Sequence, residues 1–117
     1  MSYDVSLRKD GKVVQTDKHQ IRGGTYQVGG TEGLWLNITY NYGKHFAMAL
    51  GEGGIRKIYG MTAEGSIPVL QEAIGKLGEE VDEDYWKPTE GNARAALEGL
   101  LQMAKICPHR DAIWTGD

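Results

Sequence analysis

Hydrophobic and polar residues alternate near the start of the chain, as they do in a half-buried β-strand. Tyr3, Val5 and Leu7 are separated by polar residues, and this spacing puts the apolar side chains on one face. An Asp-Gly pair follows, and then a second short apolar run, KVVQT. Asp-Gly between two such runs favours a tight turn, because glycine accepts the positive φ that the turn requires. Residues 2–17 are therefore predicted to form a β-hairpin.

Two more strands are predicted before the first helix. The segment TYQV, at 25–28, is short and bounded by glycines, and GLWLNITY, at 33–40, alternates. The apolar face of the second segment carries Leu34, Leu36, Ile38 and Tyr40. Its other face carries Trp35, Asn37 and Thr39, which is an unusually polar and aromatic set for a plain sheet-forming segment.

Apolar residues at helical spacing follow the strands. A short helix is predicted from Tyr42, capped by Asn41, and a second from a cap at Ser66 to about Gly78. A short strand is predicted between them at 55–59. The longest helix is predicted from a cap at Thr89 to Pro108, which cannot continue a helix. The tail is expected to dock to the body through its last apolar residues, Ala112, Ile113 and Trp114.

Strands that come first and helices that come later indicate an α+β fold. We predict a small antiparallel sheet of about four strands, including the N-terminal hairpin, packed against two or three helices in a single domain over 1–117. The chain has 117 residues, of which 40% are hydrophobic and 25% charged. This composition is typical of one soluble globular domain.

The charge and cysteine content exclude several classes of function. A formal net charge of -3 argues against a surface that follows a nucleic-acid polymer. The lone Cys107 excludes an intrachain disulfide and a cysteine-rich zinc site. No signal peptide or membrane-spanning run is recognised, so a cytoplasmic location and no membrane partner are predicted. The three histidines, His19, His45 and His109, lack metal-ligand spacing. No metal and no cofactor are predicted.

Glycine makes up 17 residues of the chain, about twice the usual share. GEGGIRK resembles a phosphate-binding loop but lacks the Gly-Lys-Ser/Thr of a P-loop and the last glycine of a dinucleotide motif. Its backbone amides and the cations of Arg56 and Lys57 could still bind one phosphate. The alternative is a flexible connection with solvated basic residues.

Aromatic and amide side chains are concentrated in NITYNYG and YWKPTEGN. Nucleobases are recognised by this combination, because aromatic faces stack on the base and polar groups bond to its edge. The alternative is that these aromatic residues form the core. The predicted stacking residues are Tyr26, Tyr40, Tyr42 and Trp86. The predicted base- or ribose-reading residues are Asn37, Asn41, Thr89 and Asn92, with His45 beside them. The predicted phosphate-binding residues are Arg22, Arg56, Lys57 and Arg94.

A stripe of small residues at every fourth position of the last helix, Gly91, Ala95 and Gly99, indicates close approach of another helix. That helix is either the middle one of the same chain or its copy in a second subunit. A homo-oligomer is therefore predicted.

The segments RGGTYQVGGTEGLWLNITYNYGKHF, IRKIYGMTAEGSIPVL, DYWKPTEGNARAAL and WTGD resemble a family of small phage and prophage proteins over nearly the whole chain. Some small phage proteins without a catalytic motif are anti-defence factors, including sponges that bind an immune nucleotide signal without cleaving it. The likeness to sponges is one of general character. It implies a phage protein, acting in the bacterial host cell, that sequesters a messenger of the cyclic nucleotide or cyclic ADP-ribose type. The alternatives are a small nucleotide hydrolase or lyase that uses His45 and a nearby acid, or a protein–protein inhibitor of a host defence factor.

Overall fold

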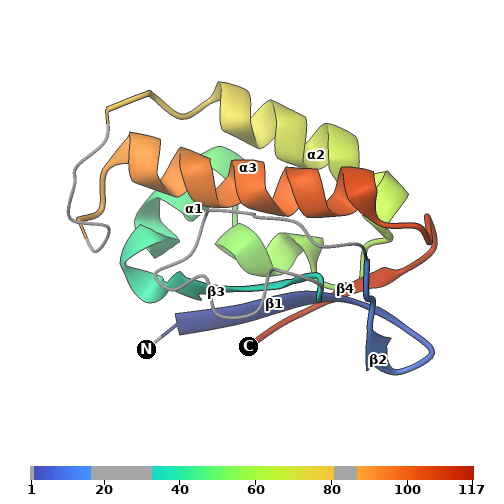
Figure 1. Ribbon diagram of the computed structural model, residues 1–117. Helices are drawn as coiled ribbons and strands as arrows, with labels where there is room; N and C mark the ends of the chain where they lie inside the picture. The colour runs from blue at the N-terminus through green and yellow to red at the C-terminus, as the bar shows by residue number, and fades with distance from the viewer. Residues whose placement is uncertain (1, 17–32, 81–86) are drawn as a thin grey trace.

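The computed structural model describes residues 2–16, 33–80 and 87–117. An antiparallel sheet forms one layer and the helices lie against one of its faces (Figure 1). This is the predicted α+β arrangement. The strands are β1 (Ser2–Lys9), β2 (Lys12–Val13), β3 (Trp35–Thr39) and β4 (Ile113–Thr115).

Strand β1 is the centre of the sheet. It pairs with β2 and β3 along one edge and with β4 along the other, all antiparallel. The N-terminal hairpin is confirmed: Asp10 and Gly11 both have positive φ, 53° and 79°, between β1 and β2. The predicted strand at 25–28 lies outside the described residues.

The helical layer contains α1 (Gly43–Leu50), α2 (Ala63–Gly75) and α3 (Glu90–Ile106), with two short 3-10 helices, η1 (Tyr40–Tyr42) and η2 (Gly54–Ile58). Thr89 caps α3 as predicted, since its side chain accepts a hydrogen bond from the amide of Asn92. Helices α2 and α3 lie side by side over the sheet (Figure 1).

Three local predictions are corrected by the structure. The segment predicted as a strand at 55–59 is mostly the 3-10 helix η2. The glycines before it form turns, and the amide of Arg56 donates to Gly53 O, which is the i→i+3 bond of a 3-10 helix. Helix α2 begins at Ala63 rather than after Ser66, because Thr62 caps it through the amide of Gly65. Thr39, not Asn41, is the side-chain cap of the segment before α1.

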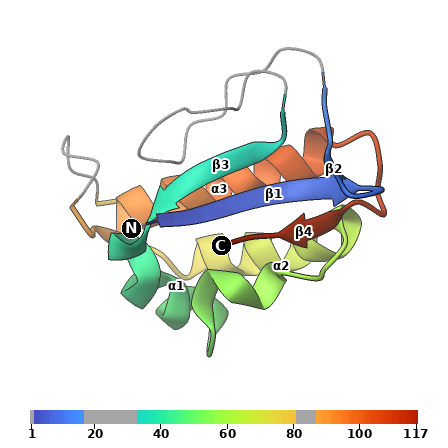
Figure 2. The same cartoon turned by 90° about the horizontal axis from the view of Figure 1, so that it is seen from below.

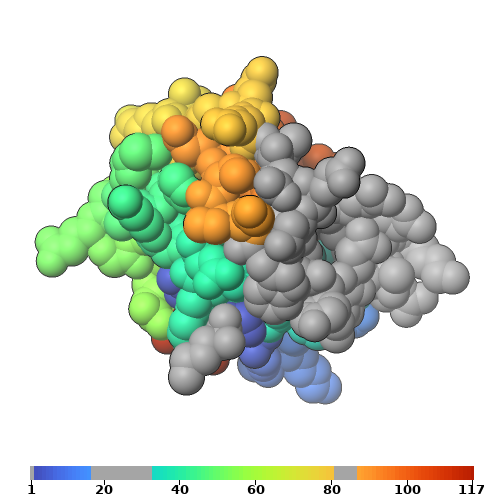
Figure 3. Space-filling view, turned by 90° about the vertical axis from the view of Figure 1, so that its left-hand side faces the viewer, coloured from blue at the N-terminus to red at the C-terminus, as the bar shows by residue number. Residues whose placement is uncertain are grey.

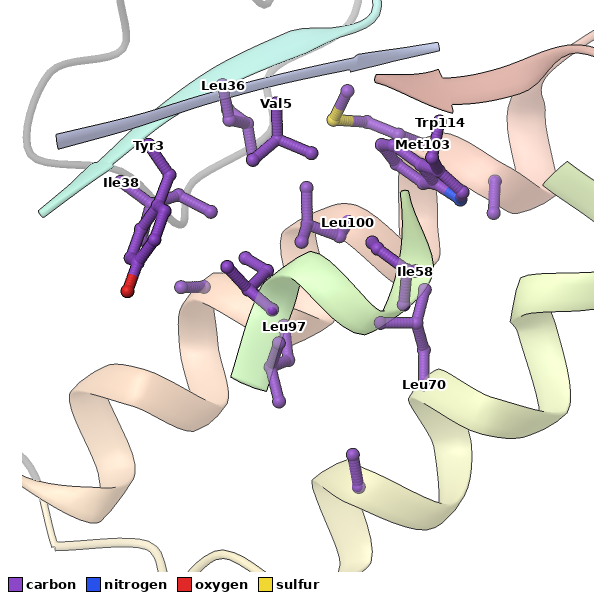
Figure 4. Close-up of a cluster of buried hydrophobic side chains, with 14 of the residues drawn as sticks. Tyr3, Val5, Leu36, Ile38, Ile58, Leu70, Leu97, Leu100, Met103 and Trp114 are labelled. Carbon is purple, nitrogen blue, oxygen red and sulfur yellow. The ribbon is translucent and has the colours of Figure 1, made fainter. Parts of the chain in front are cut away.

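The core lies between the two layers (Figure 4). The buried face of the sheet carries Tyr3, Val5, Leu7, Leu34, Leu36, Ile38 and Trp114, and all of these are buried. They pack against Ile58, Leu70, Leu97, Leu100 and Met103 from the helical layer. The tail docks through Ala112 and Trp114 as expected, and it does so by adding strand β4 to the sheet. Ile113, also expected to dock, is exposed, because alternation along β4 turns it away from the core.

Candidate functional site

The face of the sheet opposite the helices carries a set of polar side chains in register. Alternation along β1 places Asp4, Ser6 and Arg8 on this face, because their neighbours point into the core. Strand pairing sets Asn37 beside Asp4 and Trp35 beside Ser6. Figure 2 looks onto this face, and no described helix covers it.

An open hollow of about 560 Å³ lies on this face, and we call it the outer-face hollow. Its lining residues are Asp4, Ser6, Arg8, Val13, Trp35, Thr115, Gly116 and Asp117. All four described strands therefore contribute to it: β1 in the middle, β2 and β3 on one side and β4 on the other. The hollow combines one indole ring, two hydroxyl groups and charges of both signs.

Hydrogen bonds hold the polar groups of the hollow in place. Ser6 Oγ and Thr115 Oγ1, on neighbouring strands, are 3.0 Å apart. Arg8 Nε donates to Ser6 Oγ at 3.4 Å and Arg8 Nη1 donates to Gly11 O at 3.3 Å, so the guanidinium turns back toward Ser6. Both bonds of Arg8 go to neutral oxygens, and no described carboxylate pairs with it.

Asn37 lies beside the hollow and orients Asp4. Its Nδ2 donates to Ser2 Oγ at 2.6 Å and to Asp4 Oδ1 at 2.7 Å. Asp4 makes no ion pair with a described residue. Asp4 and Arg8 are thus two opposite charges, four residues apart on one strand, that do not neutralise each other.

Trp35 supplies the aromatic surface of the hollow, and Gly33 makes room for it. A Cβ added at Gly33 would lie 3.0 Å from Trp35 Cδ1 and 3.4 Å from Trp35 Nε1. The indole therefore occupies space that a side chain at position 33 would need. No described residue accepts a hydrogen bond from the indole N–H. One glycine of the glycine-rich stretch thus shapes the aromatic wall of the hollow.

A second cluster surrounds Arg56, next to Tyr3 near the start of β1. Its guanidinium lies 5.3 Å from the ring centre of Tyr3 and 5.9 Å from that of Tyr40, and the two rings are 4.5 Å apart. Arg56 Nε also donates to both carboxylate oxygens of Asp117, at 3.0 and 3.1 Å. Tyr40 is 37% exposed. The structure therefore brings the predicted residues Tyr40 and Arg56 together, and Arg56 already forms an ion pair with Asp117.

A third group lies where α1 meets the start of α3. His45 Nε2 is 2.6 Å from Pro88 O, and the side chain of Asn92, which is 7% exposed, donates to Lys87 O at 3.1 Å. Figure 3 looks onto this end of the molecule, where the start of α3 (orange) lies against α1 (teal). His45, Thr89 and Asn92, three of the predicted ligand-binding residues, lie at this junction, and their described bonds hold its backbone.

The other predicted site residues are separate from these groups. Tyr42 is completely buried, with its ring in edge contact with Phe46. It belongs to the core, because the 3-10 turn of η1 points it inward. Lys57 Nζ donates to Leu50 O at the end of α1. Arg94 contacts Glu79, Glu98 and Leu77 O.

Four predicted residues remain. Asn41 is exposed in η1. Arg22, Tyr26 and Trp86 lie outside the described residues.

A comparison with models of known protein families, with curated proteins and with solved structures found no match. Within the described ranges, no helix is long and apolar enough to cross a membrane. The same ranges contain no group of three His, Cys, Asp or Glu side chains placed to hold a metal ion.

Sequence reasoning singled out Trp35 and Asn37 but missed most of the outer-face hollow. Asp4, Ser6, Arg8 and Thr115 were not candidates. The available signal was the alternation of β1: the polar positions between its core residues share the face of Trp35 once the two strands pair. Thr115 carried no such signal, because a three-residue strand is too short to show a period.

Proposed function

We propose that this protein binds a small nucleotide in the outer-face hollow and holds it without changing it chemically. The observation that carries the proposal is the hollow itself, in which Trp35 stands beside hydroxyl groups and separated charges. Its volume of about 560 Å³ is in the usual range for small-molecule sites. An indole face stacks on any base, and a guanidinium suits a phosphate.

Binding is favoured over the hydrolase alternative by the position of His45. That alternative needs His45 as a base beside a substrate. The Nε2 of His45 is 2.6 Å from Pro88 O, and His45 is not among the residues that line the hollow. The ring therefore has a structural task at the junction of α1 and α3.

The biological role follows from the resemblance to small phage and prophage proteins. A binder of this kind in a bacterial host cell would sequester a nucleotide immune messenger and so counter anti-phage defence. A cytoplasmic location and self-association belong to the same proposal. The small-residue stripe is not an argument for self-association, because Gly91 and Gly99 are buried within the single chain. The third reading, inhibition of a host defence protein, has no feature of its own that favours it.

The test is a titration of the protein with a panel of linear and cyclic nucleotides, in which binding is measured by calorimetry and by tryptophan fluorescence. Trp35→Leu should weaken binding by about 5- to 150-fold, because stacking of a base on an aromatic side chain contributes ~1–3 kcal/mol. Tyr40→Leu is the matched control, because it removes an exposed aromatic ring outside the hollow. Its affinity should equal that of the wild type.

Three outcomes would count against the proposal. If no nucleotide of the panel binds, the function is wrong. If Tyr40→Leu weakens binding and Trp35→Leu does not, the site is the Arg56 cluster instead. If the nucleotide is recovered in altered form after incubation, the protein is an enzyme.

A further inference from the structure

From the arrangement of charges in the outer-face hollow we infer that the nucleotide it receives carries a guanine base, with the base edge at Asp4 and the phosphate at Arg8. This inference rests on the proposed function and specifies the ligand class of the same site. Adenine-containing messengers, including those of the cyclic ADP-ribose type, would then be poor ligands.

The hollow has an acidic end and a basic end. Asp4 and Arg8 are four residues apart on β1, and their Cα atoms are thus about 13 Å apart at ~3.3 Å per residue. Thr115 pairs with Ser6 between them. Because β4 is antiparallel to β1, the chain beyond Thr115 runs toward the Asp4 end, where Asp117 lies against Arg56. The acidic end therefore has two carboxylates, and only Asp117 has a described cation partner.

The charges decide the orientation of the ligand. A phosphate at the Asp4 end would face a carboxylate of the same sign, and this contact is unfavourable at short range. At the other end, the guanidinium of Arg8 bonds, among the described residues, only to Ser6 Oγ and Gly11 O, and five N–H donors are available to such a group. The phosphate therefore belongs at Arg8, and the base lies toward Asp4 along the ring of Trp35.

The carboxylate of Asp4 decides the type of base. An ionised carboxylate only accepts hydrogen bonds. Asn37 already donates to Oδ1, and this bond fixes the orientation of the group, while no residue that the structure describes donates to Oδ2. Guanine presents two adjacent donors, N1–H and the N2 amine, on its Watson–Crick edge. Adenine presents an amine beside an acceptor nitrogen, so one position would face the carboxylate with a lone pair. Asp4 is exposed in the unbound protein, so the preference comes from the charge-assisted hydrogen bonds that guanine makes and adenine cannot make, and not from a buried group left unpaired.

The hydroxyl pair completes the match. Ser6 and Thr115 share one hydrogen bond, in which either atom can donate, so one of their two hydroxyl protons remains for the ligand. Guanine O6 is an acceptor on the same edge as N1–H and lies on the side away from the N2 amine. Ser6 is the next outward-facing residue of β1 after Asp4, and Thr115 pairs with it. The hydroxyl proton left on this pair is therefore suitably placed to bond to O6.

The experiment compares guanosine, inosine and adenosine 5′-monophosphates with guanosine and inorganic phosphate, by calorimetry on the full chain. We expect guanosine monophosphate to bind about tenfold tighter than adenosine monophosphate. Inosine monophosphate, which lacks the N2 amine, should fall between them. These comparisons use the wild-type protein, so they stand even if a variant fails to fold.

Two variants with matched controls test the assigned residues. Asp4→Asn should abolish the preference for guanine, so that guanosine and adenosine monophosphates bind with about the same affinity, because an amide offers a donor as well as an acceptor. Asp10→Asn makes the same chemical change at the hairpin turn, outside the hollow, and should keep the preference. Arg8→Gln should weaken both nucleotides equally and remove the advantage of guanosine monophosphate over guanosine. Arg110→Gln, at a residue that does not line the hollow, should change neither.

The possible failures are distinguishable. If no nucleotide binds, the proposed function is wrong and the base assignment falls with it. If adenosine monophosphate binds as tightly as guanosine monophosphate, and Trp35→Leu weakens both, the site stands and the guanine assignment is overturned. If Arg8→Gln leaves the advantage of the phosphate intact, the assigned orientation is wrong.

Discussion

Ser66→Ala should destabilise the protein although it removes a single oxygen atom. Ser66 in α2 and Trp114 in β4 are both 0% exposed, and Trp114 Nε1 donates to Ser66 Oγ at 2.7 Å. The hydroxyl in turn donates to Ala63 O at 2.8 Å. The variant leaves the indole N–H buried without this partner, which costs about 1–3 kcal/mol. The better helix propensity of alanine returns about 0.5 kcal/mol.

The net loss of about 0.5–2.5 kcal/mol is measurable, because a domain of this size is stable by only about 5–15 kcal/mol. Guanidinium unfolding followed by circular dichroism should show a lower midpoint at an unchanged slope. Gln71→Ala, at an exposed position of the same helix, is the control and should shift the midpoint little.

A double-mutant cycle identifies the cause of the loss. Trp114→Phe removes the N–H together with part of the ring, so adding Ser66→Ala to that background should cost much less than it does in the wild type. The reasoning is refuted if Ser66→Ala unfolds at the wild-type midpoint. It is also refuted if its cost is the same in both backgrounds, because the hydrogen bond to the indole would then not carry the energy.

Four further substitutions test the turn, the end of α2, the tail and a half-buried phenol. Gly11 has a φ of 79° with open space around it, so Gly11→Ala should cost about 1 kcal/mol in urea unfolding through backbone strain alone. Gly75→Ala, at the uncrowded end of α2, should instead stabilise the protein by about 0.5–1 kcal/mol; equal effects at the two sites would contradict the strain argument. A Cβ on residue 116 would lie 2.1 Å from Tyr59 Cζ, so Gly116→Ala should displace the tail, lower the midpoint and weaken nucleotide binding, and an unchanged midpoint would show that the ring yields. Burial raises the pKa of Tyr59, and the nearby Asp117 carboxylate adds to the rise. The stability that this phenol contributes is complete below the unfolded pKa of about 10 and is lost as pH rises beyond it toward the folded pKa. Tyr59→Phe should therefore flatten the decline in stability at alkaline pH, and an equally steep decline in both proteins would refute the assignment.

The parts of the fold that were predicted correctly depend on local chemistry. The hairpin rests on two residues that accept positive φ, and α3 rests on the Thr89 cap at one end and Pro108 near the other. Strand β4 was not predicted, because it has three residues and pairs with β1 from more than 100 positions away. The segment at 55–59 was misread because apolar residues at its ends fit both a strand and a short helix. Its 3-10 turn depends on bonds back to the preceding glycines.

The candidate site was predictable only in part for a related reason. Trp35 and Asn37 stand out in the sequence because aromatic and amide groups are unusual on an exposed strand face. Asp4 and Arg8 do not stand out, because charged residues are ordinary at the outward positions of any strand. Their significance depends on the register of three strands, which sets them around one indole. No periodicity within one segment contains that information.

Strand β4 belongs to both the core and the outer-face hollow, so the stability of the tail and the proposed binding are coupled. Trp114 points inward to Ser66 on α2, while Thr115 points outward to Ser6 in the hollow. The last residue, Asp117, pairs with Arg56, which itself lies over Tyr3 at the end of β1. Changes that loosen the inward contacts should therefore weaken the outward site without touching a ligand-facing group. A variant such as Ser66→Ala should then lose nucleotide affinity only under conditions in which β4 separates from the sheet, and keep it where the fold is intact.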